Sequence, residues 1–135
     1  MDTTETVLKR RTDLLKLLQA GGHDAEPVDD TDILVKEKAG KYLIILEERD
    51  GHYYRICFPG FLQVSSQNRK IKVMNIMNSV SARIKAVKLL LIEQSCWAVI
   101  EAFHQSPQEL MRYFDRYMSI IELAVRDTLN KWEGK

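Results

Sequence analysis

Long apolar runs are missing from this sequence. Its apolar stretches, such as residues 43–46 and 89–92, are far shorter than the roughly 20 apolar residues of a membrane-spanning helix. The opening residues include Asp2, Glu5 and Lys9, and they lack the apolar region of a secretory signal peptide. We therefore expect a cytoplasmic protein that makes no contact with a membrane.

Cysteine is also scarce. Cys57 and Cys96 are the only two cysteines in the chain, and they do not form a C-x-x-C pair. A disulfide framework needs more cysteines, and zinc and redox sites commonly use closely spaced pairs. Isolated cysteines of an intracellular protein usually behave as small apolar core residues. We expect both thiols to be free and buried.

Catalytic motifs are absent as well. The sequence contains no G-x-S-x-G, G-x-x-x-x-G-K-[ST], G-x-G-x-x-G or H-E-x-x-H pattern. His23, His52 and His104 have no histidine or cysteine three or four residues away, so we interpret them as surface histidines rather than zinc ligands. The acidic cluster within residues 47–50 precedes a turn, which indicates a solvated hairpin end rather than acid–base chemistry. We expect no catalytic residue, metal or cofactor, and hence no enzyme.

The composition is that of an ordinary globular domain. The 135 residues fall within the size range of one domain. The hydrophobic fraction of 45% and the charged fraction of 29% are typical of soluble proteins. We interpret residues 1–135 as a single domain.

The N-terminal part predicts a helix followed by a connector. An amphipathic pattern over residues 3–20 follows the capping-box spacing Asp2-x-x-Glu5 and stops at the glycine pair 21–22. Residues 23–32 are rich in acids and contain no lysine or arginine. We predict that they form a solvated connector between the helix and the first strand.

Three antiparallel strands are predicted next. From Ile33 onward the apolar period changes to about two, which is the period of a strand. Turn pairs stand at residues 39–40 (Ala-Gly) and 50–51 (Asp-Gly), as in a meander of tight hairpins. We place the strands at residues 33–38, 41–48 and 52–58, with Pro59-Gly60 ending the last one.

The second half predicts a helix, a hairpin and a closing helix. After a loop through Ser65-Ser66, apolar residues three and four apart, from Val73 to Ile84, predict a second helix. The order Ser-Pro-Gln-Glu at residues 106–109 predicts the start of a helix that runs to about Trp132. Serine can cap this helix, proline suits its first position, and glutamate can reach back to the serine amide. Between the two helices we place the hairpin strands at residues 86–92 and 97–103.

These elements predict an α+β fold of order α-βββ-α-ββ-α with an antiparallel five-stranded sheet. Residues 42–46, 89–92 and 99–100 are apolar at successive positions, so both faces of the sheet need cover. The middle helix is apolar on more than one side, since Ile71 and Met74 lie off its main stripe. Either the domain buries all of this surface, or a second subunit or bound chain covers part of it. The candidate partner or dimer surface contains Val73, Met74, Met77, Val80, Ile84, Leu90 and Ile92.

A family resemblance rests on residues 75–78 and on this order of elements. The sequence Asn-Ile-Met-Asn at residues 75–78 is similar to an Asn-x-x-Asn that the YbjN-like bacterial family carries before its second pair of strands. The hairpin segments and the proline-initiated final helix, which ends in Leu-Asn-Lys-Trp at residues 129–132, follow the same layout. The chain thus resembles the YbjN-like family, often labelled as sensory transduction regulators, and the related type III secretion chaperones. The resemblance implies a homodimer with a peptide-binding surface and implies no catalytic residues.

Two asparagines give a candidate for polar contacts. Asn75 and Asn78 lie one helical turn apart, so they can share a face of the middle helix. Their amides can bind the backbone of a peptide, or they can tie the helix to a neighbouring loop. We favour the second, structural role.

Acidic residues are missing from residues 51–92, although the net charge of the chain is only +1. The resulting positive field suits an acidic protein segment or a phosphate backbone. No RNP, KH or helix-turn-helix signature is present. We therefore rank a solvated or internally paired face first, an acidic partner second and nucleic acid third. Besides Arg55, the basic patch contains Arg69, Lys70, Lys72, Arg83, Lys85 and Lys88.

These observations favour one class of function. We expect a non-catalytic protein- or peptide-binding module, chaperone-like or regulatory, that acts as a homodimer. The alternative is binding of nucleic acid or an acidic partner through the basic residues 55–88.

Overall fold

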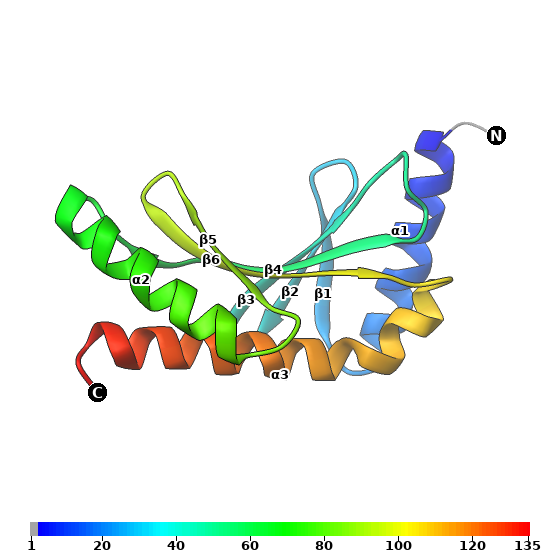
Figure 1. Cartoon of the computed structure of the whole chain (residues 1–135). Coiled ribbons are helices and arrows are strands. Elements are labelled where there is room, and N and C mark those ends of the chain that lie inside the picture. The colour runs from blue at the N-terminus through cyan, green and yellow to red at the C-terminus, as the bar shows by residue number, and fades with distance from the viewer. Residues whose placement is uncertain (1–2) are drawn as a thin grey trace.

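The chain folds into an antiparallel sheet of six strands with three helices (Figure 1). The computed structural model describes residues 3–135, with side chains from residue 6 onward. The elements are α1 (Thr3–Ala20), β1 (Asp24–Val28), β2 (Asp32–Glu37), β3 (Gly40–Leu46), β4 (Tyr53–Gln63), α2 (Gln67–Arg83), β5 (Lys88–Ile92), β6 (Ser95–Phe103) and α3 (Pro107–Trp132). The strand order in the sheet is β1-β2-β3-β4-β6-β5.

Helices α2 and α3 cover the same face of the sheet. The Tyr42 hydroxyl of β3 donates a hydrogen bond to Glu122 of α3 at 3.3 Å. The Cys96 thiol of β6 lies 3.7 Å from the Met77 sulfur of α2. Tyr42 and Cys96 point to one face because side chains alternate along a strand and paired residues share a face.

Helix α1 packs on that face too. The Arg10 guanidinium carbon lies 5.4 Å from the centroid of the Tyr54 ring. Tyr54 of β4 points to the same side as Tyr42, as the β3–β4 register requires. Within residues 3–135, no helix packs on the opposite face, which we call the helix-free face (Figure 1). The predicted α+β class is confirmed, and the helices take one side of the sheet.

The predicted count of five strands is wrong, because the supposed connector contains β1. This strand pairs with β2 from Asp24 opposite Lys36 to Val28 opposite Asp32. Asp29 adopts a left-handed conformation with φ of +53° in the turn between them. Ala25 is the only buried residue of β1. An edge strand that contacts the core at one position can be acidic elsewhere, so its sequence resembles a connector.

The predicted end of the third strand is also wrong. Strand β4 continues through Pro59-Gly60 to Gln63, and its pairing with β6 shifts between Phe58 and Leu62. Gly60 makes this irregularity feasible, because its φ of +61° is strained for residues that carry a Cβ. The two residues that we interpreted as a strand end therefore form a bulge inside the strand.

The predicted helix ends are largely confirmed. Ser106 caps α3 by accepting a hydrogen bond from the Glu109 amide at 3.1 Å. The Glu109 carboxylate reaches back to the Gln105 amide at 3.2 Å, one residue before the serine amide that we predicted. Helix α1 ends at the glycine pair, where Gly22 has a φ of +87°. The capping pattern that begins at Asp2 lies outside the described residues.

Candidate functional site

A groove of ≈ 450 Å³ lies between helix α2 and strand β5. Met74 and Met77 supply much of its apolar wall on the helix side. The backbone and side chains of the edge strand form the other wall. Its complete lining is Met74, Met77, Asn78, Ser81, Lys88, Leu89, Leu90 and Leu91. The groove therefore brings together predicted surface residues of the middle helix and of the first hairpin strand.

Strand β5 has a free edge beside this groove, because it ends the sheet and pairs with β6 alone. The hairpin turns through residues 93–94, so Ile92 and Ser95 form the pair next to the turn. That pair is hydrogen-bonded in a two-residue hairpin, and bonded pairs alternate with non-bonded ones. We infer that the N–H groups of Leu89 and Leu91 point away from β6. An incoming strand can accept these hydrogen bonds.

The predicted partner surface of α2 divides into buried and exposed residues. Val73 and Val80 are fully buried in the core, so their assignment to an accessible surface is wrong. Met77 is mostly buried but still lines the groove, and Ile84 is half-buried. Met74 is 54% exposed beside the groove. The apolar residues of α2 that recur every three or four positions therefore form its core face. Met74, which lies outside that repeat, faces outward.

The two asparagines are both exposed. Among the described residues, neither Asn75 nor Asn78 forms a side-chain hydrogen bond, so the tie to a neighbouring loop that we favoured is not observed. Asn78 lines the groove, where its amide can donate and accept hydrogen bonds. Asn75 does not line it.

The predicted basic patch divides into two groups. Arg69 and Lys85 are exposed and Lys70 is half-buried, and none of the three forms an ion pair among the described residues. Their charges are free to interact with a partner. The other three residues have contacts within the chain, so they contribute less to a free positive field. Arg83 pairs with Asp127, Lys88 pairs with Glu101, and the Lys72 ammonium lies 4.6 Å from the centroid of the Trp132 ring.

The helix-free face is the second unusual surface. Leu34, Leu43, Cys57 and Val99 form a row of paired residues across four strands of this face. Cys57 and Val99 are 1% exposed, whereas Leu34 and Leu43 are only half-buried. This confirms that the strands are apolar on both faces while the helices cover one. Further apolar residues on the helix-free face are Ile45, Tyr53, Leu90, Ile92, Trp97 and Phe103.

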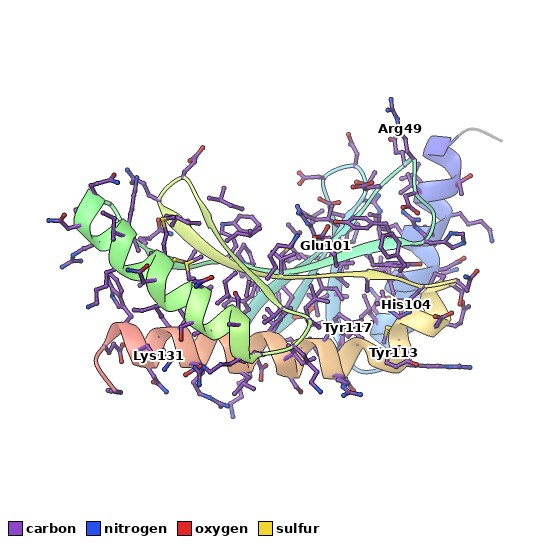
Figure 2. The ribbon with its side chains drawn as sticks, viewed as in Figure 1. Arg49, Glu101, His104, Tyr113, Tyr117 and Lys131 are labelled. Atoms are coloured by element: carbon purple, nitrogen blue, oxygen red, sulfur yellow. The ribbon has the colours of Figure 1, made fainter. Side chains whose placement is uncertain are left out.

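A charged cluster stands on the helix-free face around Glu101 (Figure 2). Its carboxylate accepts hydrogen bonds from Lys88 and, at 2.6 Å, from the Tyr53 hydroxyl. Arg55 lies 4.0 Å away. The hydrogen bond from Lys88 lowers the pKa of Glu101, whereas burial and the bond to Glu101 raise the pKa of Tyr53 to about 12. Glu101 is therefore a paired anion rather than a general base.

His104 is not a surface histidine, contrary to the prediction, because its side chain is 6% exposed. One ring nitrogen lies 3.1 Å from the Glu109 carboxylate and the other 2.8 Å from the Tyr117 hydroxyl. The ring also stacks on Tyr113, with centroids 5.5 Å apart. Figure 2 labels both residues, together with Tyr117. The cluster fixes the start of α3 to the end of β6. With both ring nitrogens engaged, its geometry favours a structural role.

The other two histidines differ from one another. His23 is half-buried, which also contradicts the surface prediction, and its Nδ1 lies 2.7 Å from the Glu37 carboxylate. His52 is exposed, as predicted. The predicted solvated hairpin end is confirmed as well, since Glu47 and Glu48 are exposed beyond the end of β3.

The prediction of two free, buried cysteines is confirmed. Cys57 points to the helix-free face and Cys96 to the helix-covered face, so the two thiols do not meet. Burial raises the pKa of Cys57 to about 11 and also raises the pKa of Cys96. Both groups are therefore protonated and poorly nucleophilic at neutral pH.

Sequence reasoning missed several residues of the two surfaces. Ser81 lines the groove one helical turn after Met77, and this spacing of four is a signal that could have found it. Leu89 and Leu91 line the groove as well. From the sequence, their apolar run indicated only that both faces of the sheet need to be covered. Leu34 and Leu43 lie side by side because of the register between β2 and β3. That register could not be read from the sequence, so the row was not predicted.

Within the described residues, no group of three or more histidine, cysteine, aspartate or glutamate side chains is placed to hold a metal ion. None of the helices within residues 3–135 has the length and apolar character needed to cross a bilayer. Comparison of the chain with known family models and with curated proteins gave no match.

Proposed function

We propose that this protein is a non-catalytic protein-binding module that takes up an extended segment of a partner at strand β5. The observation that carries the proposal is the free, apolar edge of β5 beside the α2 groove. A sheet edge supplies a row of unpaired backbone groups, and an adjacent groove receives alternate side chains of the added strand. Backbone pairing provides affinity and the groove provides selectivity. A chaperone-like or regulatory role fits this mode of binding.

The dimensions of the site define the ligand. Strand β5 spans five residues, so the paired part of the ligand is an extended segment of about 17 Å. Side chains that point to the helix-covered side enter the groove against Met74 and Leu91. The resemblance to the YbjN-like family stays a prediction from sequence, and it implies a peptide-binding surface of the same kind without catalytic residues. The cytoplasmic location stays a prediction from sequence.

Replacement of Leu91 by proline is expected to weaken peptide binding by about tenfold or more. Proline removes the outward N–H of Leu91, and a free sheet edge otherwise tolerates this residue. The measurement is fluorescence anisotropy with a labelled neutral peptide of about ten residues that alternates valine with serine. Circular dichroism verifies that the variant is folded.

Leu91→Val is the matched control, because it keeps the N–H group and an apolar side chain. We expect it to bind within about threefold of the wild type. Equal affinities of the valine and proline variants would rule out strand addition at β5. Absence of any binding by the wild-type protein would refute the proposed function.

The proposal also includes a homodimer, which we place on the helix-free face rather than on α2. Two α2 helices brought together would oppose the free charges of Arg69 and Lys70 in both copies. On the helix-free face, by contrast, Glu101 already neutralises part of the charge of Lys88 and Arg55. Two copies can therefore bury its half-exposed apolar residues without strong repulsion.

Leu43→Glu is expected to raise the dissociation constant of this homodimer by at least about tenfold, because it places a carboxylate within the apolar row. Sedimentation equilibrium measures the change. Ile71→Glu is the control, since Ile71 is 52% exposed on α2, away from the helix-free face. A wild-type chain that stays monomeric at about 100 μM, or a dimer that only Ile71→Glu disrupts, would contradict this arrangement.

A further inference from the structure

The apolar groove between α2 and β5 lies between free positive charges that precede and follow the stretch of α2 and β5 lining it. We propose, building on the proposed function, that its ligand is a protein segment with an apolar middle and acidic residues on both sides. The apolar middle pairs with β5, and the flanking carboxylates meet Arg69 and Lys70 at one end and Lys85 at the other.

The direction of α2 relative to β5 places these charges. The Val64 amide, just before α2, donates a 2.7 Å hydrogen bond to the carbonyl of Gln94 in the hairpin turn. The start of α2 therefore lies at the hairpin end of β5. Lys70 stands one helical turn before Met74 and shares its face. Arg69 and Lys70 thus belong to the hairpin end of the groove.

Lys85 belongs to the opposite end. Helix α2 ends at Arg83, and only residues 84–87 separate it from the first residue of β5. Lys85 is exposed in this connection. Its side chain lines a second hollow, together with Arg83 and Ile84 and with Arg116, Ile120 and Leu123 of α3. In sequence it stands three residues before Lys88, which lines this end of the groove. The length of β5, five residues, separates the two basic ends.

Few acidic side chains oppose these charges. Helix α2 and strand β5 contain no aspartate or glutamate. Asp127 and Glu101 face Arg83 and Lys88 and form ion pairs with them, so they leave the three free cations uncompensated. Glu93, in the exposed hairpin turn, is the one acid in the short stretch between β5 and β6. A carboxylate-bearing ligand thus finds a net positive field at either end.

The middle of the groove favours protein over nucleic acid. Its lining is aliphatic or thioether at Met74, Met77 and residues 89–91, and it includes no aromatic ring. Proteins that bind single-stranded nucleic acid combine positive charge with aromatic side chains on which bases stack. The free backbone edge of β5, in turn, is matched by another peptide backbone. A second copy of α2 and β5 is disfavoured as occupant because it carries the same charges.

The experiment compares two labelled peptides that share an apolar middle of about five residues, the length of β5. One peptide has about three glutamates on each side and the other has glutamines. We expect the glutamate peptide to bind about tenfold more tightly at about 50 mM salt, and this difference to shrink at about 500 mM. A single-stranded oligonucleotide of similar length serves as the third ligand.

Charge-removing variants locate the effect. The triple variant Arg69→Gln, Lys70→Gln and Lys85→Gln is expected to reduce the preference for the glutamate peptide to less than about threefold. It keeps the affinity for the glutamine peptide. The matched control removes three positive charges elsewhere, through Lys16→Gln, Lys38→Gln and Lys41→Gln, and it keeps the preference.

The outcomes separate this inference from the proposed function. If both peptides bind equally and the triple variant has no effect, the acidic-ligand inference is overturned while strand addition stands. If neither peptide binds, both fail. If only the oligonucleotide binds, and the triple variant loses that binding, a nucleic-acid function replaces both. If the control variant also loses the preference for the glutamate peptide, that preference reflects the net charge of the protein. This result would overturn the assignment of the acidic ligand to the groove.

Discussion

Phe114→Ala is expected to lower the free energy of unfolding by about 3–5 kcal/mol. Phe114 is fully buried in the inner face of α3. Its ring meets the His23 ring edge to face, with centroids 5.3 Å apart and planes at 87°. Truncation removes the buried ring and leaves a cavity where α3 meets the end of α1. Urea unfolding followed by circular dichroism measures the loss.

Leu123→Ala on the same helix is the control for this prediction. Leu123 is 44% exposed, so its truncation is expected to change the free energy of unfolding by less than about 1 kcal/mol. A comparable loss for the two variants would show that burial at position 114 does not dominate the stability of α3.

Arg10→Met is expected to lower the free energy of unfolding by about 3 kcal/mol. Arg10 donates 2.8 Å hydrogen bonds to the backbone carbonyls of Glu47 and Asp50, and its guanidinium lies over the Tyr54 ring. Burial lowers its pKa, but arginine remains charged at any physiological pH. Methionine keeps most of the apolar volume, so the loss reports the two orphaned carbonyls and the lost cation–π contact. Thermal and urea unfolding both measure it.

Lys9→Met provides the neighbouring control. The Lys9 side chain is 76% exposed, and its ion pair with Asp13 joins residues one turn apart on the helix surface. We expect a change of less than about 0.5 kcal/mol, as for most exposed pairs. If Arg10→Met were equally mild, the attachment of α1 to the β3–β4 turn would contribute little to stability.

Local signals predicted the helices well because the determinants lie close together in sequence. Ser106 and Glu109 form the cap of α3 within four residues. The glycine pair that ends α1 acts through backbone conformation alone. Such features depend little on distant parts of the chain, so the sequence contains nearly all the information needed to place them.

Features that depend on distant partners were predicted poorly. Strand β1 is defined by its pairing with β2. Ala25 is its only buried residue, so its sequence gives little indication that it contacts the core. The continuation of β4 past Pro59 depends on β6, which lies more than thirty residues later. His104 is buried by Tyr113 and Tyr117 of a helix that follows it. In each case the neighbour in space decides the structure.

The candidate site was predicted in part. Met74, Leu90 and Asn78 were named from sequence, and all three line the groove. Val73 and Val80 were assigned to the same surface from their apolar stripe. Such a stripe indicates that a helix face is covered, but it does not distinguish the protein's own core from a partner. Burial in the core settles that question for both residues. The free edge of β5 follows only from the strand order, which no local pattern encodes.

The two edges of the sheet differ in a way that limits assembly. Edge strand β1 carries Pro27 and the charges of Asp24 and Glu26, and such features discourage pairing with another strand. Edge strand β5 has no proline and a run of four apolar residues. If a partner strand adds at β5, as we propose, it can add at that side only, and the added strand meets no receptive edge on a further copy of this chain. The proposed recruitment would then end after one step and give a complex of fixed size, although unpaired edges of this kind can otherwise lead to fibrils.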